Sequence, residues 1–153
     1  MKKDSLRHFL ATIAYRARKV ILGSPAGFGT FDAGRGVRNP TEILSHMSNV
    51  LQHAQSFFIT TETTRISVGT WEQDVERFFR VLSELEKLLE AGTEPKGRTA
   101  EQLLQGPLAD AMTHIGQLAM LRRMACAPIP KEDFDEAPIR LGDVGLTQRS
   151  NLD

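Results

Sequence analysis

Hydrophobic residues recur at three- and four-residue spacing in four segments of the chain, which is the period of an amphipathic helix. These segments run from about Ser5 to Ile21, from Asn39 to Phe58, from Thr70 to Leu89 and from Pro107 to Ala125. No segment shows the alternation of apolar and polar residues that is typical of a strand. We therefore expect an all-α protein, a four-helix bundle formed by a single domain over residues 1–153.

Two of the predicted helices begin with clear capping signals. Asn39 is followed by Pro40 at the first helical position and by Glu42 at the third, an arrangement typical of a capping box. Thr70 has Gln73 in the corresponding position. These signals predict the starts of the second and third helices.

The connections between the helices differ in character. The glycine-rich segment GSPAGFGTFDAGRGVR (23–38) lacks both GxxxxGK[ST] and a GxGxxG between a strand and a helix. We interpret it as a crossing connection, since about 16 residues in extended form could span the length of a bundle. A short helical turn, Thr99–Leu104, is expected before Gly106 and Pro107 restart the chain as the last helix. Prolines at positions 128, 130 and 138 predict an irregular tail over about 127–153.

Composition narrows the functional classes. Nineteen basic and nineteen acidic residues give a formal net charge of zero, which argues against broad binding to nucleic acid or to an anionic membrane. The single Cys126 cannot form an intramolecular disulfide, and we expect it to be an ordinary buried thiol. Since no secretory leader or membrane-spanning segment is evident, a cytoplasmic location is expected.

Three polar residues lie on or beside the apolar faces of the helices. Asp110 and His114 are one turn apart and project from the same side of the last helix, while His46 lies at the edge of the second helix's apolar stripe. Two interpretations stay open at this point. The residues could form a structural hydrogen-bond network, or they could bind zinc or ferrous iron, both of which accept two histidines and one carboxylate. His53 lies roughly 10 Å along the helix from His46 and cannot easily share an ion with it.

Two stretches resemble a known family. NPTEILSHMSNVL (39–51) and DAMTHIGQLAMLRRMACAPIP (110–130) are similar to the DinB-like superfamily of helical bundles, the DinB/YfiT-like metalloenzymes, through a PxEIxxH pattern and an HxGQ block. The resemblance implies a divalent metal ion, nickel or zinc in different members, held by three side chains that are usually all histidine. It assigns two of these ligands to His46 and His114. The third position carries Asp110, a departure that changes the charge of the site and its metal preference.

The resemblance also implies an activity. Relatives include thiol-dependent S-transferases and metal-dependent hydrolases or isomerases, so we expect a metal-dependent transferase or hydrolase that acts on a small-molecule substrate. Gln117 could orient a ligand or water beside the ion. No general base other than Asp110 and no Arg or Lys cluster stands out. The alternative is a non-catalytic helical bundle, an interaction protein with a degenerate metal site.

A homodimer is the expected assembly. The resemblance suggests it, and the ends of the second and third predicted helices carry more aromatic surface than one small core requires. These aromatic residues are Phe57, Phe58, Phe78 and Phe79.

Overall fold

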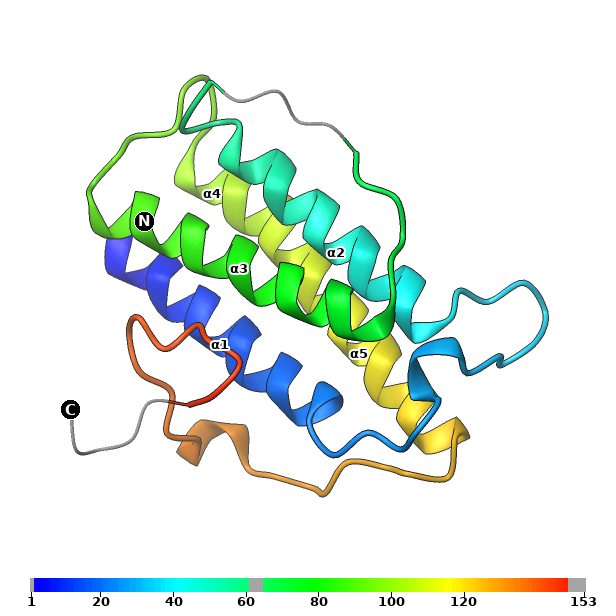
Figure 1. Ribbon diagram of the computed structural model, residues 1–153. Coiled ribbons are helices and arrows are strands. Elements are labelled where there is room, and N and C mark those ends of the chain that lie inside the picture. Colours follow the sequence, from blue (N-terminus) through cyan, green and yellow to red (C-terminus); the bar gives the residue numbers. More distant parts are fainter. Residues whose placement is uncertain (1, 61–64, 149–153) are drawn as a thin grey trace.

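The computed structural model describes residues 2–60 and 65–148. Its long helices are α1 (Lys3–Ile21), α2 (Pro40–Gln55), α3 (Trp71–Glu90) and α5 (Ala109–Met124), and its short ones are η1 (Phe28–Thr30), α4 (Ala100–Leu103), η2 (Leu104–Leu108) and η3 (Phe134–Glu136) (Figure 1). The described residues contain no strand, which confirms the all-α bundle. No helix among them is both long and apolar enough to cross a bilayer.

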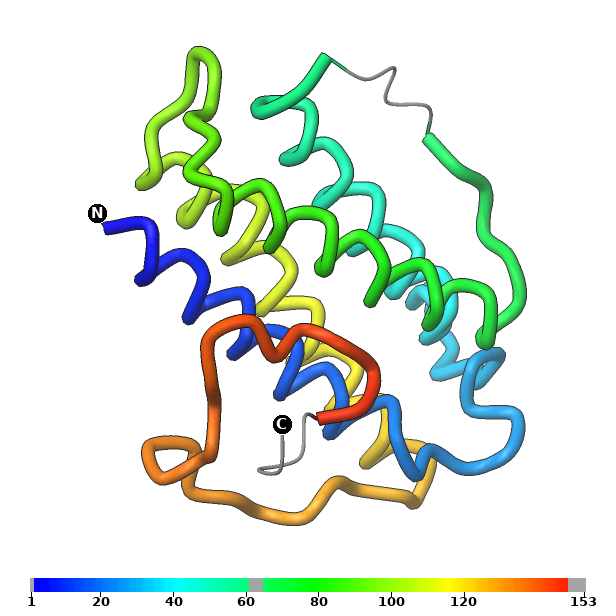
Figure 2. Tube along the Cα trace, turned by 60° about the vertical axis from the view of Figure 1, so that its left-hand side comes forward, coloured from blue at the N-terminus to red at the C-terminus, as the bar shows by residue number. Residues whose placement is uncertain are grey.

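Helices that follow one another in sequence are not all neighbours in space. α1 packs against α3 and α5, and α2 packs against the same two helices, so α1 and α2 lie at opposite corners of the bundle. α2 and α3 run in one direction while α1 and α5 run in the other (Figures 1 and 2). The connection between α1 and α2 therefore crosses one end of the bundle, near the beginning of α2 and the end of α5, and does not run along the length of the bundle as the sequence suggested.

The observed helix starts follow the capping signals. The Asn39 side chain accepts a hydrogen bond from the Glu42 backbone nitrogen, and Pro40 occupies the first turn of α2. At α3, Thr70 and Gln73 form both hydrogen bonds of a capping box. These contacts satisfy backbone donors that a helix start would leave without partners.

The last helix differs from the prediction. Instead of ending and restarting at Pro107, the chain continues from α4 through the π-helical segment η2 into α5. Proline lacks the backbone N–H of a regular helix and its ring collides with the preceding turn. The wider π-helical turn accommodates Pro107 without a break. This irregular turn lies immediately before Asp110.

The aromatic residues that were expected at the surface lie in the core. Phe58, Phe78 and Phe79 are buried, and Phe57 packs partly buried against the same apolar cluster. α2 and α3 form the most extensive helix pair and enclose these side chains. The aromatic residues that were expected to support a dimer are therefore packed inside the monomer.

The segment after α5 crosses the surface of α1 (Figure 2). Arg18 is buried beneath it and donates a hydrogen bond of 2.6 Å to the Gly145 carbonyl, with Asp143 3.5 Å away. Val144 is buried in the core, and the Tyr15 hydroxyl donates to Glu132. One side of the bundle is thus covered by the chain's own tail.

Candidate metal centre

His46, Asp110 and His114 meet between α2 and α5. Because α2 and α5 are neighbours, His46 faces the turn of α5 that carries the other two residues. One potential ligand atom from each residue lies within 4.8 Å of the other two. The imidazole centroids of His46 and His114 are 4.7 Å apart. The sequence-based prediction that these three residues converge is therefore confirmed.

The spacing around the carboxylate is close to that of a metal site. Asp110 Oδ2 lies 3.5 Å from His46 Nε2 and 3.4 Å from His114 Nδ1. Both separations exceed the usual 2.7–3.2 Å or so of an N–H···O hydrogen bond. Two ligands held about 2.1 Å from one tetrahedral ion lie roughly 3.4 Å apart. The separation of Asp110 Oδ2 and His46 Nε2 therefore suits two ligands of one ion, while the 3.4 Å distance involves the His114 nitrogen that faces the α5 backbone.

The hydrogen bonding of His114 selects its ligating nitrogen. His114 Nδ1 lies 2.7 Å from the backbone carbonyl oxygen of Asp110. A carbonyl oxygen can only accept, so Nδ1 carries the proton and donates. The lone pair of the neutral ring is then on Nε2, which is the form that a metal ion requires.

Asp110 has a buried oxygen without a hydrogen-bond donor. Its Oδ2 atom is shielded from solvent, and nothing in residues 2–60 and 65–148 donates a hydrogen bond to it. Leaving a buried carboxylate oxygen without a partner is costly, and most such atoms in proteins are satisfied. A cation between the carboxylate and the two imidazoles would remove that cost. The residues present therefore fit a bound divalent ion.

His46 is held in the neutral form. Burial lowers the pKa of His46 below its usual value, and the neighbouring His114 and Arg38 act in the same direction, whereas Asp110 opposes them. A neutral imidazole keeps the lone pair that binds a metal ion. Two neutral histidines and one carboxylate leave coordination positions open for water or a substrate.

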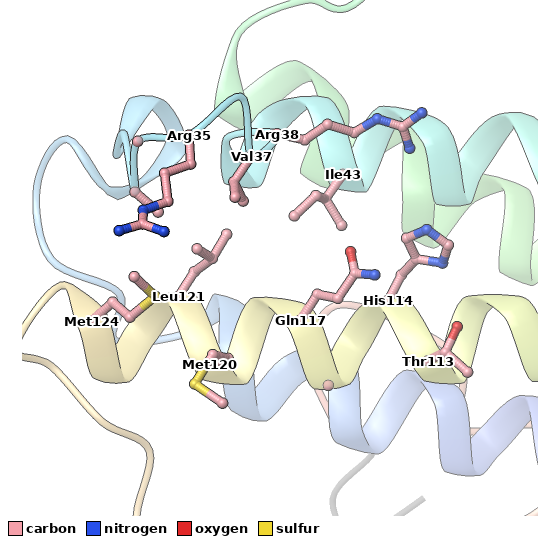
Figure 3. Close-up of a pocket in the computed structure, with 13 residues that line it drawn as sticks. Arg35, Val37, Arg38, Ile43, Thr113, His114, Gln117, Met120, Leu121 and Met124 are labelled. Carbon is pink, nitrogen blue, oxygen red and sulfur yellow. The ribbon is translucent and has the colours of Figure 1, made fainter.

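Two pockets adjoin the centre. A pocket of about 820 Å³ includes His114 and Gln117 in its wall, and a second pocket of about 410 Å³ includes His46. Figure 3 shows Gln117 and Ile43 projecting between α5 and α2 beside His114. The larger volume falls within the range of small-molecule sites.

Arg35 and Arg38 also reach this region, which the sequence did not indicate. Both line the larger pocket, and Arg38 lines the smaller one as well. They come from the glycine-rich connection, whose lack of periodicity gave no clue to where it lies. The crossing from α1 to α2 brings these two arginines to the wall of the pocket beside the centre. No arginine or lysine cluster was evident in the sequence because the two residues lie on a segment without helical periodicity.

The connection is fixed in place at Gly29. The Thr41 hydroxyl donates to the Gly29 carbonyl oxygen at 2.7 Å, and Phe28 packs edge-to-face against Trp71. A Cβ atom at position 29 would lie only 2.6 Å from the Trp71 Cβ, so only glycine fits this approach. These contacts hold the segment that carries the two arginines against α2 and α3.

The remaining histidines and the cysteine lie elsewhere. His8 and His53 are exposed and belong to no cluster of potential ligands in the described chain, as expected. Cys126 is exposed, which contradicts the prediction of a buried thiol. α5 ends at Met124, and Cys126 takes a left-handed conformation (φ 59°) that directs the chain away from the core.

Comparison with models of protein families, with curated proteins and with solved structures found no match to this chain.

Proposed function

We propose that the chain binds one divalent metal ion through His46, Asp110 and His114 and acts as a metal-dependent enzyme of the transferase or hydrolase type. The observation that carries the proposal is the convergence of the three residues around a buried carboxylate oxygen with no donor. When bound, zinc, nickel or iron with an open position lowers the pKa of a water or a thiol and supplies a nucleophile at neutral pH.

The protein's own residues provide the rest of the site. The hydrogen bond from His114 to the α5 backbone fixes the orientation of the imidazole. Gln117 projects into the larger pocket beside His114 and offers both a donor and an acceptor to a bound molecule (Figure 3). That pocket is where a small-molecule substrate would bind.

The metal proposal is tested with histidines of the same helix. His46→Ala removes a proposed ligand, whereas His53→Ala removes an exposed histidine of α2 outside the cluster. Calorimetric titration of zinc into untagged, metal-stripped protein should show one site per chain in the natural sequence and in His53→Ala. The same titration should show loss of that site in His46→Ala and His114→Ala. Equal zinc binding by all four proteins would overturn the proposal.

We also propose membership of the DinB-like superfamily. The support is the all-α bundle together with the positions of His46 on one helix and the HxGQ block on another. The rival function is an interaction protein with a degenerate site, and a chain that never takes up metal would favour it.

Assembly and location stay proposals with less support. A homodimer rests on the family resemblance alone, because the aromatic residues expected at its surface lie inside the monomer. Light scattering at tens of micromolar tests it, and a single-chain mass would reject it. A cytoplasmic location is supported by the free thiol of Cys126, which suits a reducing compartment.

A further inference from the structure

We infer that the larger pocket binds an organic anion with an apolar body, whose charged group is held by Arg35 and whose opposite end lies at the metal centre. The inference rests on the proposed function, since it names the substrate class of that same site. It is based on three observations: two arginines without acidic partners in the pocket wall, the apolar residues of that wall, and the difference between the two ends of the pocket.

Arg35 and Arg38 line the pocket as exposed side chains, whereas the more buried Arg7 and Arg18 are paired with acids. Arg7 contacts Glu86, and Arg18 contacts Asp143. By contrast, neither Arg35 nor Arg38 makes a hydrogen bond or an ion pair within residues 2–60 and 65–148. Two exposed cations in a pocket wall whose described lining contains no Asp or Glu favour a negatively charged ligand.

The pocket wall is apolar between its two ends. Val37, Met120 and Met124 line it and are each at least half exposed, while Ile43 and Leu121 line it from the bundle core. Exposed apolar side chains around a concave site are typical of ligand pockets. Methionine also adapts its shape to an apolar ligand.

The pocket has a definite polarity along α5. Figure 3 shows the Arg35 guanidinium over the Leu121 and Met124 end of α5, while His114 stands at the other end and the Arg38 side chain extends toward that end along α2. Seven residues separate His114 from Leu121, which corresponds to roughly 10 Å of helix. A ligand that reaches both ends therefore needs an apolar body of roughly that length, with its anionic group away from the ion.

The backbone conformation at Arg35 allows the replacement of this residue by asparagine. Gly34, Arg35 and Gly36 all have positive φ, and Arg35 has φ 58°. Asparagine tolerates this region better than most residues and carries no charge. Arg35→Asn therefore removes the guanidinium without straining the turn. Arg123→Asn makes the same change at an exposed position of α5 outside the pocket wall.

Decanoate is the probe, with decanol and decyltrimethylammonium as neutral and cationic controls, all below their micelle-forming concentrations. Binding is followed by NMR of the methionine methyl groups in the metal-free protein. Met120 and Met124 line the pocket and report on ligand binding there, and Met47, which lies in the core, serves as the reference. Decanoate should shift the Met120 and Met124 signals but not that of Met47.

Arg35→Asn should weaken decanoate binding about five- to tenfold, as loss of a charge-assisted contact does. Arg123→Asn should leave it unchanged.

Three outcomes would overturn the inference. Equal binding of decanol or decyltrimethylammonium would remove the requirement for an anion. Equal weakening by Arg123→Asn would remove the role of Arg35. Met120 and Met124 signals that change with protein concentration and no longer respond to decanoate would show that a second copy of the chain covers the pocket.

A cobalt(II)-loaded sample tests which end of the ligand meets the ion. Paramagnetic relaxation should be stronger for the terminal methyl of decanoate than for the methylene beside its carboxylate. The reverse order would show that the carboxylate binds the ion, which contradicts the assigned orientation. If the protein takes up no cobalt but binds decanoate through Arg35, the metal proposal fails while the ligand class stands.

Discussion

The two sides of the bundle treat their charges in opposite ways. On the α1 side, the tail covers Arg18, which donates to the Gly145 carbonyl and lies beside Asp143. On the side formed by α2 and α5, Asp110 keeps a buried oxygen without a donor among the described residues, and Arg35 has no acidic partner there. Other buried polar atoms of the described chain, such as Arg16 Nε, also have no hydrogen-bond partner, so the difference points to a site because two histidines converge on the Asp110 oxygen.

The buried arginine under the tail should give the largest change in stability. Arg18→Met keeps the aliphatic volume but removes the hydrogen bond to the Gly145 carbonyl and one partner of a buried ion pair, a change that typically costs about 3–5 kcal/mol. Chemical denaturation measures this loss, and hydrogen exchange at residues 143–145 should show the tail opening. A loss below about 1 kcal/mol would show that the α1 side does not depend on this contact.

Gly29→Ala should have an intermediate effect. The added Cβ would meet Trp71 Cβ at 2.6 Å and Thr41 Oγ1 at 2.7 Å, so the connection must shift, at a cost of about 1–3 kcal/mol. The shift should also weaken decanoate binding, because Arg35 lies on the same segment. Gly106→Ala is the matched control, since a Cβ there meets no atom within 4 Å. Equal stability of the two variants would mean that Gly29 does not fix the connection.

Asp110→Asn should give the smallest change, and in the opposite direction. In metal-free protein it removes a carboxylate whose buried oxygen has no donor in the described chain, so stability should stay the same or rise by up to about 1 kcal/mol. Added zinc should raise the melting temperature of the natural protein and not of the variant, because ligand binding stabilises only a protein that has the site. A clear loss of metal-free stability would show that Asp110 is a structural residue.

The helices and the three candidate ligands could be predicted because their signals are local. Helical periodicity and the capping residues at Asn39 and Thr70 depend on near neighbours in sequence. Asp110 and His114 share a face because of their four-residue spacing, His46 lies at the edge of its own helix's apolar stripe, and the family resemblance supports joining the three in one site. These predictions needed no knowledge of which helices are neighbours.

Features that depend on tertiary packing could not be predicted. Arg35 and Arg38 reach the site only because α1 and α2 lie at opposite corners of the bundle, so their connection must cross it. The burial of Phe78 and Phe79 depends on which helices meet. Pro107 usually marks a helix boundary, and only the π-helical turn at η2 allows it inside a helix.

Zinc X-ray absorption of the loaded, untagged protein tests the central claim most directly. The account predicts a first shell of nitrogen and oxygen atoms at about 2.0–2.2 Å, with the outer-shell scattering of two imidazoles. His114→Ala should lose the bound zinc, and His53→Ala should retain the natural spectrum. A sulfur shell at about 2.3 Å would place the ion at Cys126 instead. That result, or a protein that retains no zinc, would contradict a metal centre formed by His46, Asp110 and His114.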